Sequence, residues 1–253
     1  MPVPPDAPPL LVLLPGMDGT GIMFEPFLEA LGKWPTRVLR YPVALTSYAD
    51  CIAFARDHLP VDRPFLLLGE SFSGPVALAL GAERPKGLVG VVLCSTFARN
   101  PRPGLGWLAP LLRTLPAPRL PPSWLRRLLL GGRKAGAMEH LVDTMLTFFP
   151  PATLKGRLLA VGALDHTECL RQIQVPMLAL VAAQDRLVPK SAAAWLRNHG
   201  PTLDMVRLQG PHWLLQTRPS ACVQAIQDFL ARNQGRPEPP APVPVTPRGV
   251  RWS

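Results

Sequence analysis

The sequence contains few cysteines and no long apolar run. Only four of its 253 residues are cysteine, and none stands in a Cys-x-x-Cys pair. Scattered cysteines provide neither metal-ligand spacing nor a disulfide framework, so we expect reduced, mostly buried thiols and no metal site. The chain also lacks the stretch of about 20 apolar residues that a membrane-spanning helix requires. Its N-terminus has no basic segment before a long apolar stretch, as a signal peptide would, and we expect a cytoplasmic enzyme.

Acidic residues are also scarce. The chain has 27 Lys and Arg against 17 Asp and Glu, a net charge of +10. Eleven of the basic residues and only four of the acidic ones lie between Phe97 and Arg171, so this segment carries +7 of that charge. Clustered charge attracts anionic partners, and a solvated cationic face is the alternative. Nucleic acid is a poor candidate because the segment shows no helix-turn-helix, zinc-finger or RNA-recognition signature.

Apolar runs and helical periodicities alternate along most of the chain. We predict strands over residues 10–14, 37–40, 64–68, 88–94, 176–182 and 202–207. Helices are predicted over residues 23–32, 47–59, 72–84, 190–198 and 219–233. This alternation is typical of an α/β fold with a doubly wound, mostly parallel sheet.

The alternation is interrupted in the middle of the chain and absent at both ends. Residues 97–171 are rich in proline and contain amphipathic pieces near 124–130 and 138–149. We interpret this segment as a cationic helical lid inserted into a core formed by residues 10–96 and 172–234. Residues 1–9 form a proline-rich lead-in, and residues 235–253, with six prolines and no apolar periodicity, are predicted to be a disordered tail.

Residues 69–74, with the sequence Gly-Glu-Ser-Phe-Ser-Gly, lie between a predicted strand and a predicted helix. A serine on such a sharp turn has a strained backbone that raises its hydroxyl above the sheet, the arrangement of a nucleophile elbow. Small residues are needed two positions before and after the serine because the strand and helix crowd together. Gly69 fits, whereas Ser73 stands where glycine is usual and Gly74 follows one position late. Ser71 is the candidate nucleophile; a glycine-rich turn without a catalytic role is the alternative.

A serine nucleophile needs a base that accepts its proton and an acid that orients the base. Asp185 follows one predicted strand, and His212 lies in the loop after the next. Because ligands bind at the carboxyl edge of such a sheet, we expect both side chains on the same rim as Ser71. The order Ser, Asp, His is also the one that accompanies a nucleophile elbow. Asp185 as a simple helix cap is the alternative; Asp165 and Glu168 are other candidate acids, but they precede the strand.

Negative charge that develops on a substrate carbonyl oxygen requires hydrogen-bond donors, the oxyanion hole. The elbow supplies the backbone N–H of Phe72. The second donor normally comes from the loop after the first strand, here the glycine-rich residues 14–21, and the N–H of Met17 is the candidate. A plain strand–helix turn is the alternative. The loop matches neither phosphate-binding glycine motif, so nucleotide binding is not indicated.

Four motifs spread over residues 10–230 resemble those of the α/β-hydrolase superfamily: Pro15-Gly16-Met17-Asp18-Gly19, Gly69-x-Ser71-x-Ser73-Gly74, Asp185-Arg186-Leu187-Val188-Pro189 and Gly210-Pro211-His212. The resemblance implies the α/β-hydrolase fold. That superfamily usually has His-Gly where this chain has Pro15-Gly16, and the Pro-Gly-x-Asp-Gly loop is similar to one in bacterial esterases and plant-type acyltransferases. The sequence therefore leaves open whether the acyl group is transferred to water or to an alcohol. The cationic insertion is similar to the lid of carboxylesterases that act on acyl-carrier-protein esters, which implies an acidic carrier protein as a possible partner.

Together these features favour a serine hydrolase that cleaves a carboxylic ester or thioester through an acyl-enzyme on Ser71, with no metal or organic cofactor. An apolar acyl pocket is expected from lid residues, although helical spacing alone would make many of them packing residues. The candidates are Trp107, Trp124, Met145 and Phe148. An acyltransferase with the same triad, another triad reaction such as cofactor-free haloperoxidase or C–C bond hydrolysis, and a non-catalytic binding protein are the alternatives.

Overall fold

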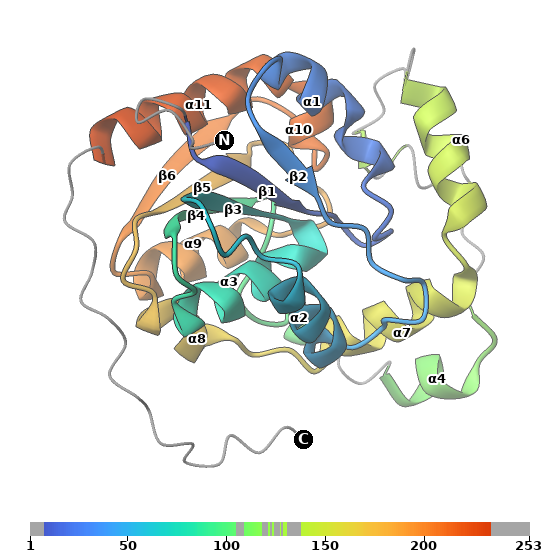
Figure 1. Ribbon diagram of the computed structural model, residues 1–253. Coiled ribbons are helices and arrows are strands. Elements are labelled where there is room, and N and C mark those ends of the chain that lie inside the picture. Colours follow the sequence, from blue (N-terminus) through green and yellow to red (C-terminus); the bar gives the residue numbers. More distant parts are fainter. Residues whose placement is uncertain are drawn as a thin grey trace.

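Six strands form one sheet at the centre of the computed structural model (Figure 1). The structure describes residues 8–104, 109–117, 121, 123, 127, 129–130 and 138–233. Every strand pair is parallel, and the spatial order is β2-β1-β3-β4-β5-β6. The strands are β1 (Leu10–Leu14), β2 (Thr36–Val38), β3 (Phe65–Glu70), β4 (Leu88–Cys94), β5 (Met177–Ala182) and β6 (Leu203–Leu208). The predicted doubly wound parallel sheet is confirmed.

Helices cover both faces of this sheet (Figure 1). One face packs against α2 (Tyr48–Asp57), α3 (Gly74–Glu83), α8 (Thr167–Gln172) and α9 (Lys190–His199). The other packs against α1 (Glu25–Leu31), α10 (Leu214–Thr217) and α11 (Pro219–Asn233). Alternate strand residues serve the two cores because successive side chains of a strand point to opposite faces. Burial on both faces explains why the central strands are continuously apolar.

Several element boundaries differ from the prediction. Strand β3 continues through Gly69 and Glu70, which pair with Leu93 and Cys94 of β4. The helix predicted from residue 72 begins as a 3-10 turn, η2 (Ser71–Ser73), before α3. The helix predicted from residue 23 likewise begins as a 3-10 turn, η1 (Ile22–Phe24), before α1. Strand β2 is short and ends at Val38, where the sequence pattern suggested residue 40.

The described part of residues 97–171 contains three helices besides the start of α8: α4 (Ala109–Thr114), α6 (Met138–Phe148) and α7 (Pro151–Gly162). Backbone bonds join the two ends of this insertion, from Asn100 N–H to the Leu164 carbonyl at 2.9 Å and from His166 N–H to the Ala98 carbonyl at 2.7 Å. The insertion therefore leaves and re-enters the core at one place. Most of the helix predicted near residues 124–130 lies outside the described residues, and the role of a lid stays a prediction.

The described part of the chain shows three further features that bear on the sequence analysis. No helix in it combines the length and apolar character needed to cross a bilayer. No group of three or more His, Cys, Asp or Glu side chains within these residues is placed to hold a metal ion. All four cysteines are free, and three of them are buried, as expected: Cys51, Cys94 and Cys222.

Candidate active site

Ser71 stands at the turn between β3 and α3. Its φ is +50°, in the left-handed region that a residue with a side chain rarely adopts. The turn is tight enough that a Cβ on Gly69 would lie 2.5 Å from the Ser73 carbonyl oxygen. Glycine at 69 is therefore required by the close approach of strand and helix. This is the strained strand-to-helix geometry that the sequence predicts for a nucleophile elbow.

The unusual serine at position 73 has a structural role. Its side chain is fully buried, and its hydroxyl donates a hydrogen bond to the Pro15 carbonyl. The same oxygen lies 3.0 Å from the Tyr41 hydroxyl. Gly74 is the position without room for a side chain, because a Cβ there would overlap the Thr96 side chain. Ser73 thus ties the elbow to the loop after β1, where a glycine could not.

We expect Ser73→Ala to lower the free energy of unfolding by about 1–3 kcal/mol, because the buried Pro15 carbonyl and Tyr41 hydroxyl would lose their partner. Urea unfolding followed by circular dichroism measures the change. Ser191→Ala is the control, because Ser191 is exposed and its replacement is expected to change the free energy of unfolding little. Ser47→Ala is unsuitable, because Ser47 caps α2. Equal stability of Ser73→Ala and wild type would show that the bridge contributes nothing.

The three predicted catalytic side chains form one hydrogen-bonded chain. His212 Nε2 lies 2.9 Å from Ser71 Oγ, and His212 Nδ1 lies 2.8 Å from Asp185 Oδ2. Asp185 Oδ1 accepts the backbone N–H groups of Leu187 at 2.8 Å and Val188 at 2.9 Å. With both carboxylate oxygens engaged, Nδ1 carries the proton that faces Asp185 and Nε2 is free to accept the serine proton.

The sheet brings these distant residues together. Ser71 follows β3, Asp185 follows β5 and His212 follows β6, so all three lie beyond the carboxyl ends of parallel strands. The His212 side chain is only 3% exposed. The next residue, Trp213, packs in an apolar cluster with Met145 of the insertion. The insertion therefore contacts the loop that carries the candidate base.

The loop after β1 forms a tight turn in which Gly19 N–H donates to the Gly16 carbonyl at 3.1 Å. Met17 lies inside this turn. The register pairs Leu14 of β1 with Gly69 of β3, which places the turn beside the elbow. Among the residues that the structure describes, neither the Met17 N–H nor the Phe72 N–H donates to a backbone carbonyl. Both predicted oxyanion donors are therefore available to a ligand.

Comparison with known proteins identifies the family. The alpha/beta hydrolase family model matches residues 7–225. The chain belongs to the alpha/beta hydrolase family. It is 24% identical over 216 residues to the pimeloyl-[acyl-carrier protein] methyl ester esterase of Neisseria meningitidis, a match that covers 77% of this chain and 82% of that protein. It is 28% identical over 235 residues to phytyl ester synthase 1, chloroplastic, of Arabidopsis thaliana, covering 78% of this chain. The match spans only 33% of the plant protein.

Solved structures support the same fold. A lipase-esterase related protein from Clostridium acetobutylicum superposes with a TM-score of 0.72 at 16% identity, covering 88% of this chain and 95% of that one. A hydrolase from Pseudomonas aeruginosa superposes with a TM-score of 0.68 at 23% identity, covering 89% and 92%. The expected α/β-hydrolase fold is confirmed, and membership of the family supports hydrolase activity in general.

Arg157 is a site residue that the sequence analysis did not identify. It comes from α7 of the insertion, yet its side chain is fully buried behind the loop after β1. Its Nη1 donates to the Met17 carbonyl at 2.7 Å, and its Nε and Nη2 donate to the Leu45 carbonyl at 3.0 and 2.9 Å. A Cβ on Gly19 would collide with this guanidinium. Arg157 therefore holds in place the loop that carries the candidate donor, the Met17 N–H, and burial lowers the pKa of Arg157.

This placement corrects part of the interpretation of the insertion as a cationic face. Arg157 is no surface charge. Three further cations of the insertion contact the protein itself: the Arg99 guanidinium stacks 3.2 Å above the Trp195 ring, Arg102 donates to the Arg186 carbonyl, and Lys155 donates to the Arg113 and Leu115 carbonyls. Four of the eleven basic residues of the insertion therefore contact either the core or the insertion itself.

Glu70 is a second group that the sequence analysis did not single out. Its carboxyl is buried directly before the nucleophile and accepts one hydrogen bond, from Gln216 Nε2 at 2.9 Å. Burial raises its pKa to about 7. Gln216 Oε1 is buried without a partner among the described residues. Protonation of Glu70 supplies an O–H that this amide oxygen could accept after a flip of the amide.

Glu70 gives a prediction for the pH dependence of stability. Because the folded-state pKa is raised above the ordinary 4.5, the protonated carboxyl stabilises the fold fully below about pH 4.5, and that stabilisation is lost as the pH rises through about 7. The expected loss is roughly 3 kcal/mol. Urea unfolding between pH 4.5 and 8 measures it, and Glu70→Gln is expected to flatten this decline. The exposed Glu29→Gln is the control, and parallel curves for Glu70→Gln and wild type would contradict the prediction.

The four residues predicted to form an acyl pocket in the lid differ in burial. Met145 is buried in the cluster with Trp213, whereas Phe148 is 57% exposed. Trp107 and Trp124 lie outside the described residues. Met145 thus packs the insertion against the catalytic rim, and acyl binding by any of the four stays a prediction.

Proposed function

We propose that this chain is a serine hydrolase that cleaves a carboxylic ester or thioester through an acyl-enzyme on Ser71. The observation that carries the proposal is the continuous Ser71–His212–Asp185 hydrogen-bonded chain at the carboxyl edge of the sheet. The esterase among the relatives supports ester hydrolysis as the reaction class.

The proposed reaction has two stages, acylation and deacylation of Ser71. Ser71 Oγ attacks the substrate carbonyl carbon while its proton passes to His212 Nε2, 2.9 Å away. Asp185 Oδ2 stabilises the imidazolium that forms. The N–H groups of Met17 and Phe72 donate to the carbonyl oxygen as it becomes negative. His212 then gives its proton to the leaving alkoxide or thiolate, and the acyl-enzyme remains. A water attacks that ester and loses a proton to His212, which then passes it to Ser71 Oγ as the C–O bond breaks and the acid leaves.

Acyl transfer to an alcohol is the second candidate, because the plant relative is named an ester synthase. It shares the acyl-enzyme and differs only in the second acceptor. Incubation of the enzyme with a p-nitrophenyl ester and a range of alcohols, followed by chromatography of the products, separates the two. We expect the free acid as the main product at millimolar alcohol. Predominant formation of the new ester would identify the chain as an acyltransferase. Absence of turnover with all esters and thioesters tested would contradict both candidate functions.

An acidic acyl carrier protein stays a proposed partner, supported by the name of the Neisseria relative and by the basic insertion. Added salt screens such contacts. Raising the salt concentration should increase KM for a carrier-linked ester and leave KM for a p-nitrophenyl ester unchanged. Equal salt dependence of both substrates would argue against carrier recognition. A cytoplasmic location likewise stays a prediction.

A further inference from the structure

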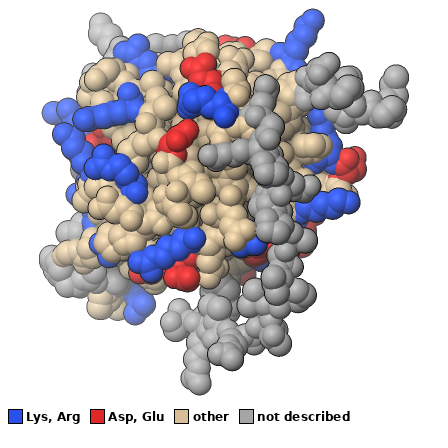
Figure 2. Space-filling view, turned by 90° about the vertical axis from the view of Figure 1, so that its left-hand side faces the viewer, with Lys and Arg blue, Asp and Glu red and all other residues tan. Residues whose placement is uncertain are grey.

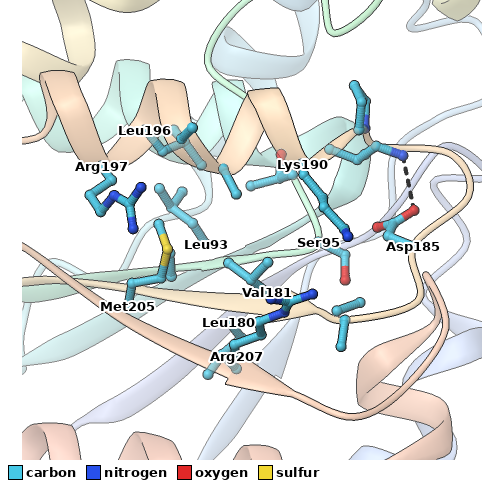
Figure 3. Close-up of a pocket in the computed structure, with 18 residues that line it drawn as sticks. Leu93, Ser95, Leu180, Val181, Asp185, Lys190, Leu196, Arg197, Met205 and Arg207 are labelled. Carbon is cyan, nitrogen blue, oxygen red and sulfur yellow. Dashed lines mark hydrogen bonds between the residues drawn. The ribbon is translucent and has the colours of Figure 1, made fainter.

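A cavity of about 170 Å³ lies between helix α9 and the carboxyl halves of β5 and β6. Val181 and Met205 line it from the sheet, beside Leu93 of β4 (Figure 3). Ala193 and Ala194 line it from α9. Because alanine side chains are short, the helix and sheet leave a space here that larger residues would fill. The cavity therefore has an apolar wall of the kind that holds an aliphatic chain.

Three cations surround this apolar wall. Lys190 and Arg197 stand two turns apart on α9, and Arg207 rises from β6. In Figure 3, Lys190 and Arg207 extend toward the Ser95 hydroxyl, and Arg197 stands at the opposite end. None of the three forms an ion pair with a carboxylate among the described residues.

The one carboxylate in the cavity lining is already engaged. Asp185 binds His212 through Oδ2 and accepts the N–H groups of Leu187 and Val188 through Oδ1. The wider surface is also positive: on the face that includes the β6 edge, Lys and Arg side chains are spread more widely than Asp and Glu (Figure 2). With three cations and one carboxylate, the lining keeps a net positive charge, which favours an anion in the cavity.

Ser95 adds a hydroxyl at the same end. It follows β4, is 4% exposed, and has a φ of +46°, a strained conformation for a residue with a side chain. Its hydroxyl lines the cavity, and its hydrogen-bond partner among the described residues is the weak Cys94 thiol donor at 4.0 Å. The O–H of Ser95 can therefore donate to a ligand. The end of the cavity with Ser95 and Asp185 lies at the carboxyl ends of β4 and β5, the edge where ligands of open α/β sheets bind.

We propose that this cavity binds a small amphipathic anion, a carboxylate attached to a short aliphatic chain, at a site separate from Ser71. The carboxylate lies between Lys190, Arg207 and the Ser95 hydroxyl, where it gains charge-assisted hydrogen bonds. The chain lies along Val181 and Met205. Both parts of the ligand contribute to binding. A carboxylate without the aliphatic chain would leave the apolar wall exposed, and an aliphatic chain without the carboxylate would leave the cations without an anion.

Isothermal titration calorimetry with hexanoate, acetate and hexanol tests the proposal on the full chain. We expect hexanoate to bind more tightly than acetate, and hexanol to bind weakly or undetectably. Arg207→Gln is expected to weaken hexanoate binding about tenfold, the effect of losing one charge-assisted hydrogen bond. Ala194→Leu, which fills the space beside α9, is expected to remove the binding. Both variants should keep the esterase activity of wild type, and the exposed Lys33→Gln, outside the cavity, is the control for charge.

Several results would overturn the proposal. Failure of hexanoate to bind the wild-type protein is one. Binding to Arg207→Gln and Ala194→Leu as tight as to wild type is another, because it would place the binding elsewhere. Equal affinity for hexanoate and hexanol would show that the cations do not bind the carboxylate. Because these outcomes concern ligand binding and not turnover, they are independent of whether Ser71 proves to be the nucleophile.

Discussion

Ser71→Ala is expected to reduce kcat for p-nitrophenyl esters by about 10⁴-fold or more, because no other hydroxyl stands within hydrogen-bonding distance of His212 Nε2 among the described residues. The variant should fold normally, since it loses one partly buried hydroxyl and keeps the backbone of the turn. Steady-state kinetics and urea unfolding, run side by side, separate the two effects.

The exposed Ser191→Ala is the matched control and is expected to keep wild-type kinetics. Near-wild-type activity of Ser71→Ala, with preparations shown to be free of contaminating esterase, would remove Ser71 from the mechanism. Loss of activity together with loss of the folded state would call for His212→Gln as a second variant, for which the account predicts a comparable fall in kcat.

Arg157→Met is expected to lower kcat about 10²-fold, the effect of weakening one oxyanion-hole donor. The substitution leaves the Met17 and Leu45 carbonyls without their buried partner, so the loop that carries the Met17 N–H loses its fixed position. KM should change less than kcat, because the hole acts on the transition state. Arg157→Lys, which retains a cation and can reach one carbonyl, should recover part of the loss.

Lys155→Met is the matched control, since Lys155 stands on the same helix and also donates to backbone carbonyls, but within the insertion. If Arg157 had only a structural role, Arg157→Met would lower the free energy of unfolding and leave kcat per folded molecule unchanged. A fall in kcat that Arg157→Lys partly rescues would instead identify Arg157 as a positioning residue for the oxyanion hole.

Most of the sheet could be predicted because β1, β3, β4 and β5 are short, mostly apolar runs, each preceded by a proline or a glycine. The candidate triad could also be predicted, since Ser71, Asp185 and His212 each follow a recognisable strand and parallel strands share one carboxyl edge. The ends of β2 and β3 were less certain, because pairing with a neighbouring strand decides where a strand ends. Gly69 and Glu70, for example, belong to β3 through their partners on β4 and, for Gly69, through Leu14 of β1 as well.

The supporting residues could not be predicted because their roles depend on contacts between distant parts of the chain. Arg157 looks like one more cation of a basic segment, and only the folded chain brings it to Met17, 140 residues away. Glu70 and Gln216 meet across 146 residues. Ser73 looks like a departure from the glycine of a nucleophile elbow until its bonds to Pro15 and Tyr41 are seen. The sequence around each of these residues does not indicate which distant residue it contacts.

Labelling with a fluorophosphonate tests the central claim most directly, because this reagent forms a stable phosphonyl ester with a serine that a neighbouring base activates. The account predicts one label per chain, on the peptide that contains Ser71, with activity falling in proportion to labelling. A fully labelled Ser71 in an enzyme that retains its activity, or inactivation with the label on another residue, would contradict it.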